Sequence, residues 1–131
     1  MTVQNVIRLV TVVGVRGRPS SPREMSLSAL HLAVLDDGRR LTLLDDRGWT
    51  ESGPSDIWHH TSREEIEATA RTVVGPDEPS GHDTAQHMAT THWEHLAGVL
   101  HRHGVQADAR ELSNLPHEVE LSDRVVARLT D

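Results

Sequence analysis

The chain has 131 residues, a net charge of -7 and no cysteine, and these properties exclude several classes of protein. Its length fits a single domain over residues 1–131 that needs no cross-link to fold. The lack of cysteine excludes disulfides, thiolate metal sites and a cysteine nucleophile. Arginines are spread along the chain and outnumbered by acids, so we expect neither nucleic acid nor an anionic membrane as a partner.

The first residues of the chain do not have the pattern of a signal peptide, which needs a basic region followed by an apolar run. No stretch reaches the ~18 apolar residues of a membrane span. We therefore expect a cytoplasmic protein. The sequence contains no lysine, which excludes Schiff-base and lysine-base chemistry. Its arginine-only basic set, with much alanine, valine and aspartate, is typical of a bacterial genome rich in GC.

The first half of the chain predicts strands. Residues 3–16 are rich in β-branched residues and apolar on both faces, which indicates a strand in the middle of a sheet. Residues 17–22 have the composition of a loop. Residues 27–46 alternate in polarity around an Asp-Gly turn at 36–38, which predicts a hairpin. A second turn is predicted at 45–48.

The second half predicts helices. We expect a helix over residues 61–74, the longest helix over 84–103, a short fourth strand over 105–112, and a short helix near the C-terminus. The expected capping residues are Thr61 with Glu64 or Ser62 with Glu65, Asp83 with Gln86, and Ser122. Strands followed by helices indicate an α+β fold. The predicted architecture is an antiparallel sheet of three to four strands, formed by the N-terminal strands and the hairpin, with two main helices and the short C-terminal helix packed on one face.

Ten histidines are the main chemical signal in the sequence. His92 falls inside the apolar arc of the predicted long helix, and His95 lies at the edge of that arc. This spacing lets both rings reach one ion, but a zinc site needs at least three protein ligands. The third would come from His59, His60 or Asp83, and nothing in the sequence selects one. A metal site at His92 and His95 is therefore not favoured, and no cofactor is expected, with zinc as the alternative.

Two histidines are candidate catalytic residues. For His92 the expected role is a neutral core group bonded to a backbone carbonyl, and the alternative is acid–base catalysis. His31 lies in the hairpin, where we expect a solvated cross-strand residue, and the alternative is a residue that lines a cavity. The candidate ligand-binding residues are Trp58, His59 and His60, although Trp58 is expected to fill the core beneath the first helix, since tryptophan is mostly buried.

Two functions agree with these observations. The first is a small acidic binding module that recognises another protein, or a second copy in a homodimer, through an exposed strand edge. The alternative is a small enzyme, an isomerase, cyclase or hydrolase, that uses histidine acid–base or metal-assisted chemistry on a small molecule. The sequence favours the first because it contains no recognisable catalytic motif.

Overall fold

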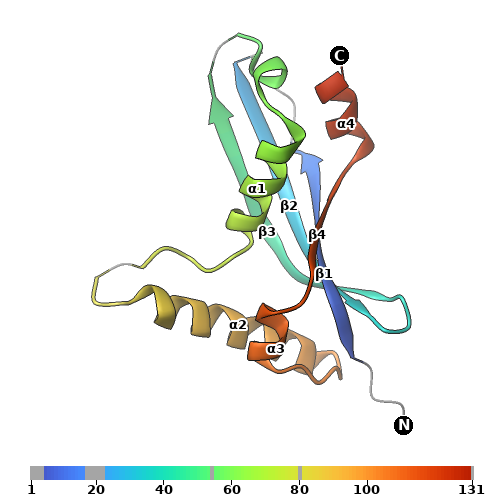
Figure 1. The fold of residues 1–131 in the computed structure, drawn as a ribbon, viewed down its shortest axis with the longest axis vertical. Helices are drawn as coiled ribbons and strands as arrows, with labels where there is room; N and C mark the ends of the chain where they lie inside the picture. The colour runs from blue at the N-terminus through green and yellow to red at the C-terminus, as the bar shows by residue number, and fades with distance from the viewer. Residues whose placement is uncertain (1–4, 17–22, 54, 80, 131) are drawn as a thin grey trace.

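A computed structural model describes residues 5–16, 23–53, 55–79 and 81–130, and Figure 1 shows its arrangement. The predicted loop at 17–22 lies outside these ranges. None of the helices within them is long and apolar enough to cross a membrane. The elements, in chain order, are β1 (Val6–Val15), β2 (Glu24–Leu35), β3 (Arg40–Ser52), the 3₁₀ helix η1 (Ile57–His60), α1 (Arg63–Val73), α2 (Ala85–Arg102), α3 (Ala109–Ser113), β4 (His117–Leu121) and α4 (Asp123–Thr130).

The four strands form one mixed sheet with the order β3-β2-β1-β4. β1 pairs antiparallel with β2 and parallel with β4, so the first strand lies inside the sheet as predicted. The α+β class is confirmed, but the prediction of a purely antiparallel sheet is wrong. A parallel pair needs a long crossover, and the helices between β3 and β4 provide it.

The fourth strand lies later in the chain than predicted. Within the predicted strand 105–112, the residues from Ala109 onward enter α3 instead. Asp108 caps this helix by accepting a hydrogen bond from the backbone N–H of Arg110. The observed strand, β4, follows the helix and alternates in polarity along His117–Leu121. Helix propensity and a capping aspartate therefore override the weak strand signal before residue 113.

β3 is one long strand, and the turn predicted at 45–48 does not form. Ala29 pairs with Arg47, whereas His31 pairs with Leu44, so β3 carries one extra residue over this interval. An extra residue of this kind is a β-bulge, which changes the face on which the following side chains lie. Arg47 is therefore placed on the same face of the sheet as His31.

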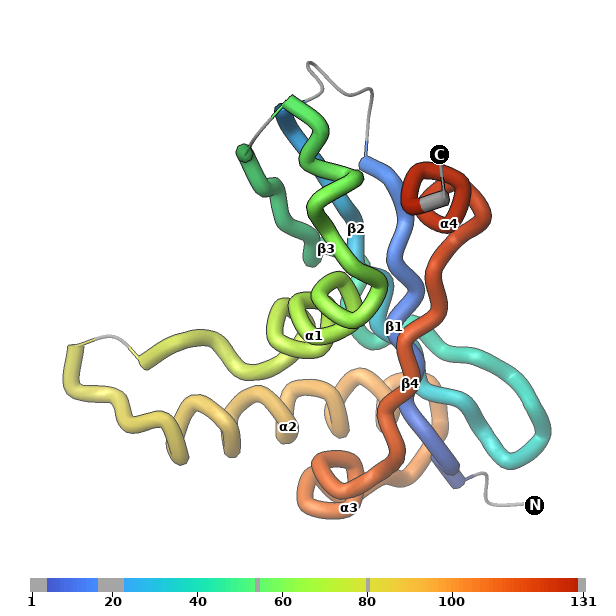
Figure 2. The backbone as a smooth tube through the Cα atoms, turned by 45° about the horizontal axis from the view of Figure 1, so that its top comes forward, coloured from blue at the N-terminus to red at the C-terminus, as the bar shows by residue number. Residues whose placement is uncertain are grey.

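The helices pack on one face of the sheet and divide the core into two apolar clusters. In Figure 2, α1 lies in front of the sheet and α2 runs below α1. One cluster joins Leu9 of β1 to Leu96 and Leu100 of α2. The other joins Val13 of β1 to Trp58, Ile66 and further residues. Trp58 is only 7% exposed, which confirms that it fills the core beneath α1.

The helix caps follow the predictions except at α2. Ser62 caps α1 by accepting a hydrogen bond from the N–H of Glu65 at 3.1 Å, and Ser122 accepts one from Val125 at 3.4 Å. Thr84, rather than Asp83, caps α2 and accepts from the N–H of His87 at 3.1 Å. Both Thr and Asp are good N-caps, so the sequence alone did not decide between neighbours.

The two edge strands of the sheet meet through an ion pair. The guanidinium of Arg40 in β3 donates two hydrogen bonds, of 2.8 and 3.1 Å, to the carboxylate of Glu120 in β4. The strands β2 and β1 lie between them in the sheet order, so the sheet must coil strongly for this contact to form. The coiling explains why Val10 and Leu32, which point away from Thr11 and the helices, are nevertheless buried.

Two glycines provide a matched test of this packing. A Cβ on Gly48 would lie 2.6 Å from the backbone oxygen of Leu27, whereas a Cβ on Gly98 in α2 would meet nothing within 4 Å. We expect Gly48→Ala to destabilise the protein by about 2 kcal/mol or more, because backbone must move to admit the methyl group. Gly98→Ala should raise the free energy of unfolding by about 0.5–1 kcal/mol. Urea unfolding of both variants measures these changes, and equal effects would contradict the described β2–β3 pairing.

Candidate functional site

Thr11 is a fully buried polar residue in the middle of β1. On its face of the sheet it lies between Leu9, which belongs to one apolar cluster, and Val13, which belongs to the other. Its Oγ1 is 3.1 Å from Nδ1 of His31 in β2 and 2.6 Å from Nε2 of His117 in β4. Thr11, His31 and His117, which we call the Thr11 triad, thus join three adjacent strands.

The strand register places these three side chains together. Thr11 and His31 are direct partners in the antiparallel ladder, so they lie on the same face. His117 pairs with Leu9, two residues before Thr11, and therefore shares that face as well. A shift of β4 by one residue would turn His117 to the opposite face.

The Thr11 hydroxyl links the protonation states of the two rings. A hydroxyl group has one proton to donate and lone pairs that accept. Between two ring nitrogens it can therefore donate to one and must accept from the other. One ring presents an N–H to Thr11 and the other presents a bare nitrogen, so the tautomers of His31 and His117 depend on each other.

Two further residues from other elements lie near His31. Arg47 of β3 donates hydrogen bonds to the carbonyl of Val73 at 3.2 Å and to the carboxylate of Asp77 at 3.1 Å. His92 of α2 and Arg47 are both close enough that their charges lower the pKa of His31. α2 and β3 thus each add one side chain beside the Thr11 triad.

Several nitrogens in this region are buried without a hydrogen-bond partner in the described part of the chain. They include Nε2 of His31, Nε2 of His92 and Nε1 of Trp49. A buried polar group without a partner costs about 1–3 kcal/mol, so such groups are rare unless they have a functional use. His92 is buried as expected, but its Nε2 does not bond the predicted carbonyl.

Burial lowers the pKa values of three histidines. For His31 the pKa falls to about 3, through loss of solvation first and then through the charges of His117, His92 and Arg47. Loss of solvation also lowers the pKa of His92, with a smaller contribution from Arg47. For His117 the same cause is followed by the Arg71 guanidinium. His31 is therefore uncharged at neutral pH.

His117 is the member of the triad that approaches solvent. His31 is 1% exposed, whereas His117 is half-buried on the edge strand β4. Arg71 of α1 is exposed and lies beside it, with its guanidinium 3.5 Å from the His117 carbonyl oxygen. Glu67, one turn before Arg71, pairs with Arg63 at 3.2 Å instead. Within the described ranges, Arg71 forms no ion pair.

The structure brings together only some of the residues that the sequence singled out. His31 and His92 approach each other, and the prediction that His31 is solvated is wrong, because the helices cover its face of the sheet. His59 and His60 are exposed while Trp58 is buried, so these three do not form a joint surface. His95 is exposed. The described residues contain no group of three side chains suited to hold a metal ion.

Sequence reasoning missed Thr11, His117, Arg47 and Arg71. His117 begins a short alternating segment, which was a usable strand signal. Thr11 is the one polar residue in an otherwise apolar stretch from Leu9 to Val13, and a buried hydroxyl needs partners. No local pattern identifies those partners, because they lie 20 and 106 residues away in the chain.

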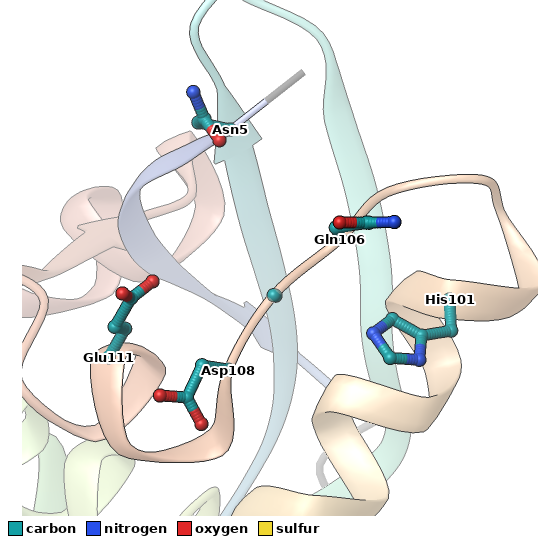
Figure 3. Close-up of a pocket in the computed structure, with 6 residues that line it drawn as sticks. Asn5, His101, Gln106, Asp108 and Glu111 are labelled. Atoms are coloured by element: carbon teal, nitrogen blue, oxygen red, sulfur yellow. The ribbon is translucent and has the colours of Figure 1, made fainter. Parts of the chain in front are cut away.

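A separate surface cavity of about 490 Å³ lies between the start of β1, the C-terminal end of α2 and α3. Figure 3 shows its polar side chains, among them His101, Asp108 and Glu111, pointing in different directions. Asp108 is also engaged as the cap of α3. The cavity therefore lacks the convergent polar groups of a binding site.

Comparisons with protein-family models, with characterised proteins and with solved structures find no match to this chain. Its function must therefore be inferred from the residues and their geometry.

The lowered histidine pKa values predict a pH-dependent stability. Between about pH 6.5 and pH 3 the unfolded chain binds a proton that folded His31 does not, so acid should destabilise the protein over this window. One such group contributes up to about 1.4 kcal/mol for each pH unit. Urea unfolding at several pH values should show a shallower slope for His31→Asn than for the native chain. The exposed His60→Asn variant serves as the control, and an equal change in both variants would contradict a neutral, buried His31.

Proposed function

We propose that the chain is a small enzyme that performs histidine acid–base chemistry on a small molecule, with His117 as the group that meets the substrate. The observation that carries the proposal is the Thr11 hydroxyl, which holds His117 by Nε2 and backs it with the buried His31. A second group that fixes the ring and its tautomer is what a catalytic histidine requires. Isomerisation, cyclisation and hydrolysis are the reaction classes that such a group serves.

The contacts of His117 leave its other nitrogen for the substrate. Because Nε2 is bonded to Thr11, Nδ1 is the atom that can take a proton from a reacting group or return one. The lowered pKa of His117 keeps the ring neutral, and so able to accept a proton, at neutral pH. This proton transfer needs no metal. Metal-assisted chemistry is the alternative form of the proposed activity.

Arg71 supports a substrate with an anionic group. Its guanidinium lies beside His117 and is exposed, while the nearest acidic residue on its helix turn is engaged by Arg63. A guanidinium in this state binds a carboxylate or phosphate through two parallel hydrogen bonds. A small carboxylate or phosphate ester is therefore the substrate class that we propose.

Hydrolysis of p-nitrophenyl acetate, a general probe for reactive imidazoles, tests this proposal. We expect the chain to accelerate release of p-nitrophenolate, and His117→Gln to abolish the acceleration. Inorganic phosphate should inhibit the native chain, because it would occupy the position beside Arg71. Arg71→Gln should remove that inhibition.

Two exposed residues away from the triad provide the controls. His87 lies on the exposed N-terminal half of α2, and Arg102 lies at the C-terminal end of the same helix. His87→Gln should keep the activity, and Arg102→Gln should keep the phosphate inhibition. A rate no higher in the native chain than in His117→Gln would overturn the proposal.

A second candidate function, recognition of a protein or of a second copy of this chain, is supported by β3. This edge strand is 13 residues long and, in the described residues, pairs only with β2. A free strand edge of this length can accept an extended segment by main-chain hydrogen bonds. The exposed Asp45 and Asp46 near its middle carry like charges, which oppose such pairing.

Sedimentation velocity over a wide concentration range tests self-association through β3. If two copies pair antiparallel through β3, the chain should dimerise. Asp46, the central residue of β3, would then face Asp46 of the second copy, so Asp46→Asn should tighten the dimer several-fold by removing the like charges. Asp83→Asn, outside the sheet, should leave the association unchanged. A native chain and an Asp46→Asn variant that both stay monomeric at high concentration, with unchanged hydrogen exchange along β3, would exclude this homodimer.

A further inference from the structure

The Thr11 hydroxyl determines more than the position of His117. When His117 is neutral, the hydroxyl can be oriented in either of two ways. It donates its proton to Nδ1 of His31 and accepts from His117, or it donates to Nε2 of His117 and accepts from His31. In the first arrangement the proton of His31 is on Nε2, and in the second it is on Nδ1.

A charged His117 removes this choice. An imidazolium carries protons on both nitrogens, so Nε2 of His117 must donate to Thr11. The Thr11 proton must then be donated to His31, whose Nδ1 has to be bare. The neutral His31 is left with its proton on Nε2, the buried nitrogen that has no partner among the described residues.

We infer that Thr11 transmits the protonation state of His117 to His31, so that a proton taken up at the surface fixes the tautomer of the buried ring. This inference deepens the proposed function, on which its catalytic meaning rests. It makes Thr11 and His31 positioning residues. They hold His117 with Nε2–H inward as long as it is charged, so the proton gained from a substrate remains on Nδ1 for return.

Burial decides which of the two rings carries the positive charge. Full proton passage would move the Nε2 proton of His117 to Thr11 and the Thr11 proton to Nδ1 of His31, leaving a charged His31. That state is unfavourable because His31 is 1% exposed and its surroundings are cationic or neutral. The positive charge therefore stays on His117, and only the hydrogen-bond direction is transmitted inward.

Within the described residues, the charged and titratable groups around His31 and His117 come from neighbouring strands and helices. His31 faces His117 of β4, His92 of α2 and Arg47 of β3. His117 faces Arg71 of α1 in addition to Thr11 and His31. Asp77 and His95 act on His92 and not on the triad. None of these groups supplies an alternative donor to Nδ1 of His31, since that atom is bonded to Thr11.

Nitrogen-15 chemical shifts of the histidine rings test the inference without any substrate. Uniformly labelled protein is titrated with acid, and the two ring nitrogens of His31 and His117 are followed through their long-range proton couplings. As His117 becomes charged, His31 should hold its proton on Nε2, with Nδ1 bare. Thr11→Ser retains the hydroxyl and should preserve this response.

Thr11→Val removes the hydroxyl at nearly constant volume, and in it the His31 tautomer should no longer respond to His117. If Thr11→Val fails to fold, His117→Phe replaces it, since that variant lacks the charge that selects the tautomer. A proton on Nδ1 of His31 while His117 is charged would overturn the inference. A substituted chain whose His31 tautomer population follows that of the native chain throughout the titration would overturn it as well. If the native chain shows the tautomer response but does not hydrolyse the ester, only the proposed function is contradicted.

Discussion

The buried hydroxyl of Thr11 is the constraint on which the interior of this protein depends. A hydroxyl placed between two apolar clusters is costly unless it is bonded, and two histidine nitrogens from neighbouring strands satisfy it. Each of those rings in turn needs a correct tautomer, because the hydroxyl has only one proton. The strands β2, β1 and β4 are therefore joined by side chains as well as by their backbone ladders. Polar contacts of this kind stabilise one strand register relative to the others.

The arrangement of the remaining elements is consistent with this constraint. β4 must run beside β1 in a register that keeps His117 on the helical face, and the parallel pairing of Leu9 with His117 achieves this. The bulge in β3 places Arg47 on the same face, where it bonds the end of α1 and Asp77. α2 adds His92. Polar groups thus form a layer between the two apolar clusters instead of being scattered through one core.

Exposure changes steadily across this layer. Arg71 is exposed, His117 is half-buried and His31 is almost completely buried. Charge is therefore tolerated at the β4 edge and resisted at β2, which is why the pKa of His31 falls to about 3. A site with this gradient can accept a proton at its surface while its interior stays neutral. At the opposite edge in the strand order, β3 pairs only with β2 among the described residues, and strand pairing along it is the second function that we propose.

Much of the fold was already present in local sequence patterns. β-branched content placed β1 in the middle of the sheet, and the Asp-Gly signal placed the β2–β3 turn. Thr61 or Ser62 marked the start of α1, where the structure selects Ser62, and Ser122 marked the start of α4. These features depend on neighbours within a few residues, so the sequence states them directly. Errors arose where local signals were weak or balanced, as in α3 and in the bulge of β3.

By itself, the sequence determined the α+β class, the central first strand, the absence of cysteine chemistry and the burial of His92 and Trp58. Only the tertiary structure decided that β4 is parallel to β1, that His31 is buried, and that Thr11, His31 and His117 meet. The physical reason is that these depend on pairing between strands distant in the chain. A register shift of one residue, which no local pattern forbids, would move His117 away from Thr11 to the opposite face.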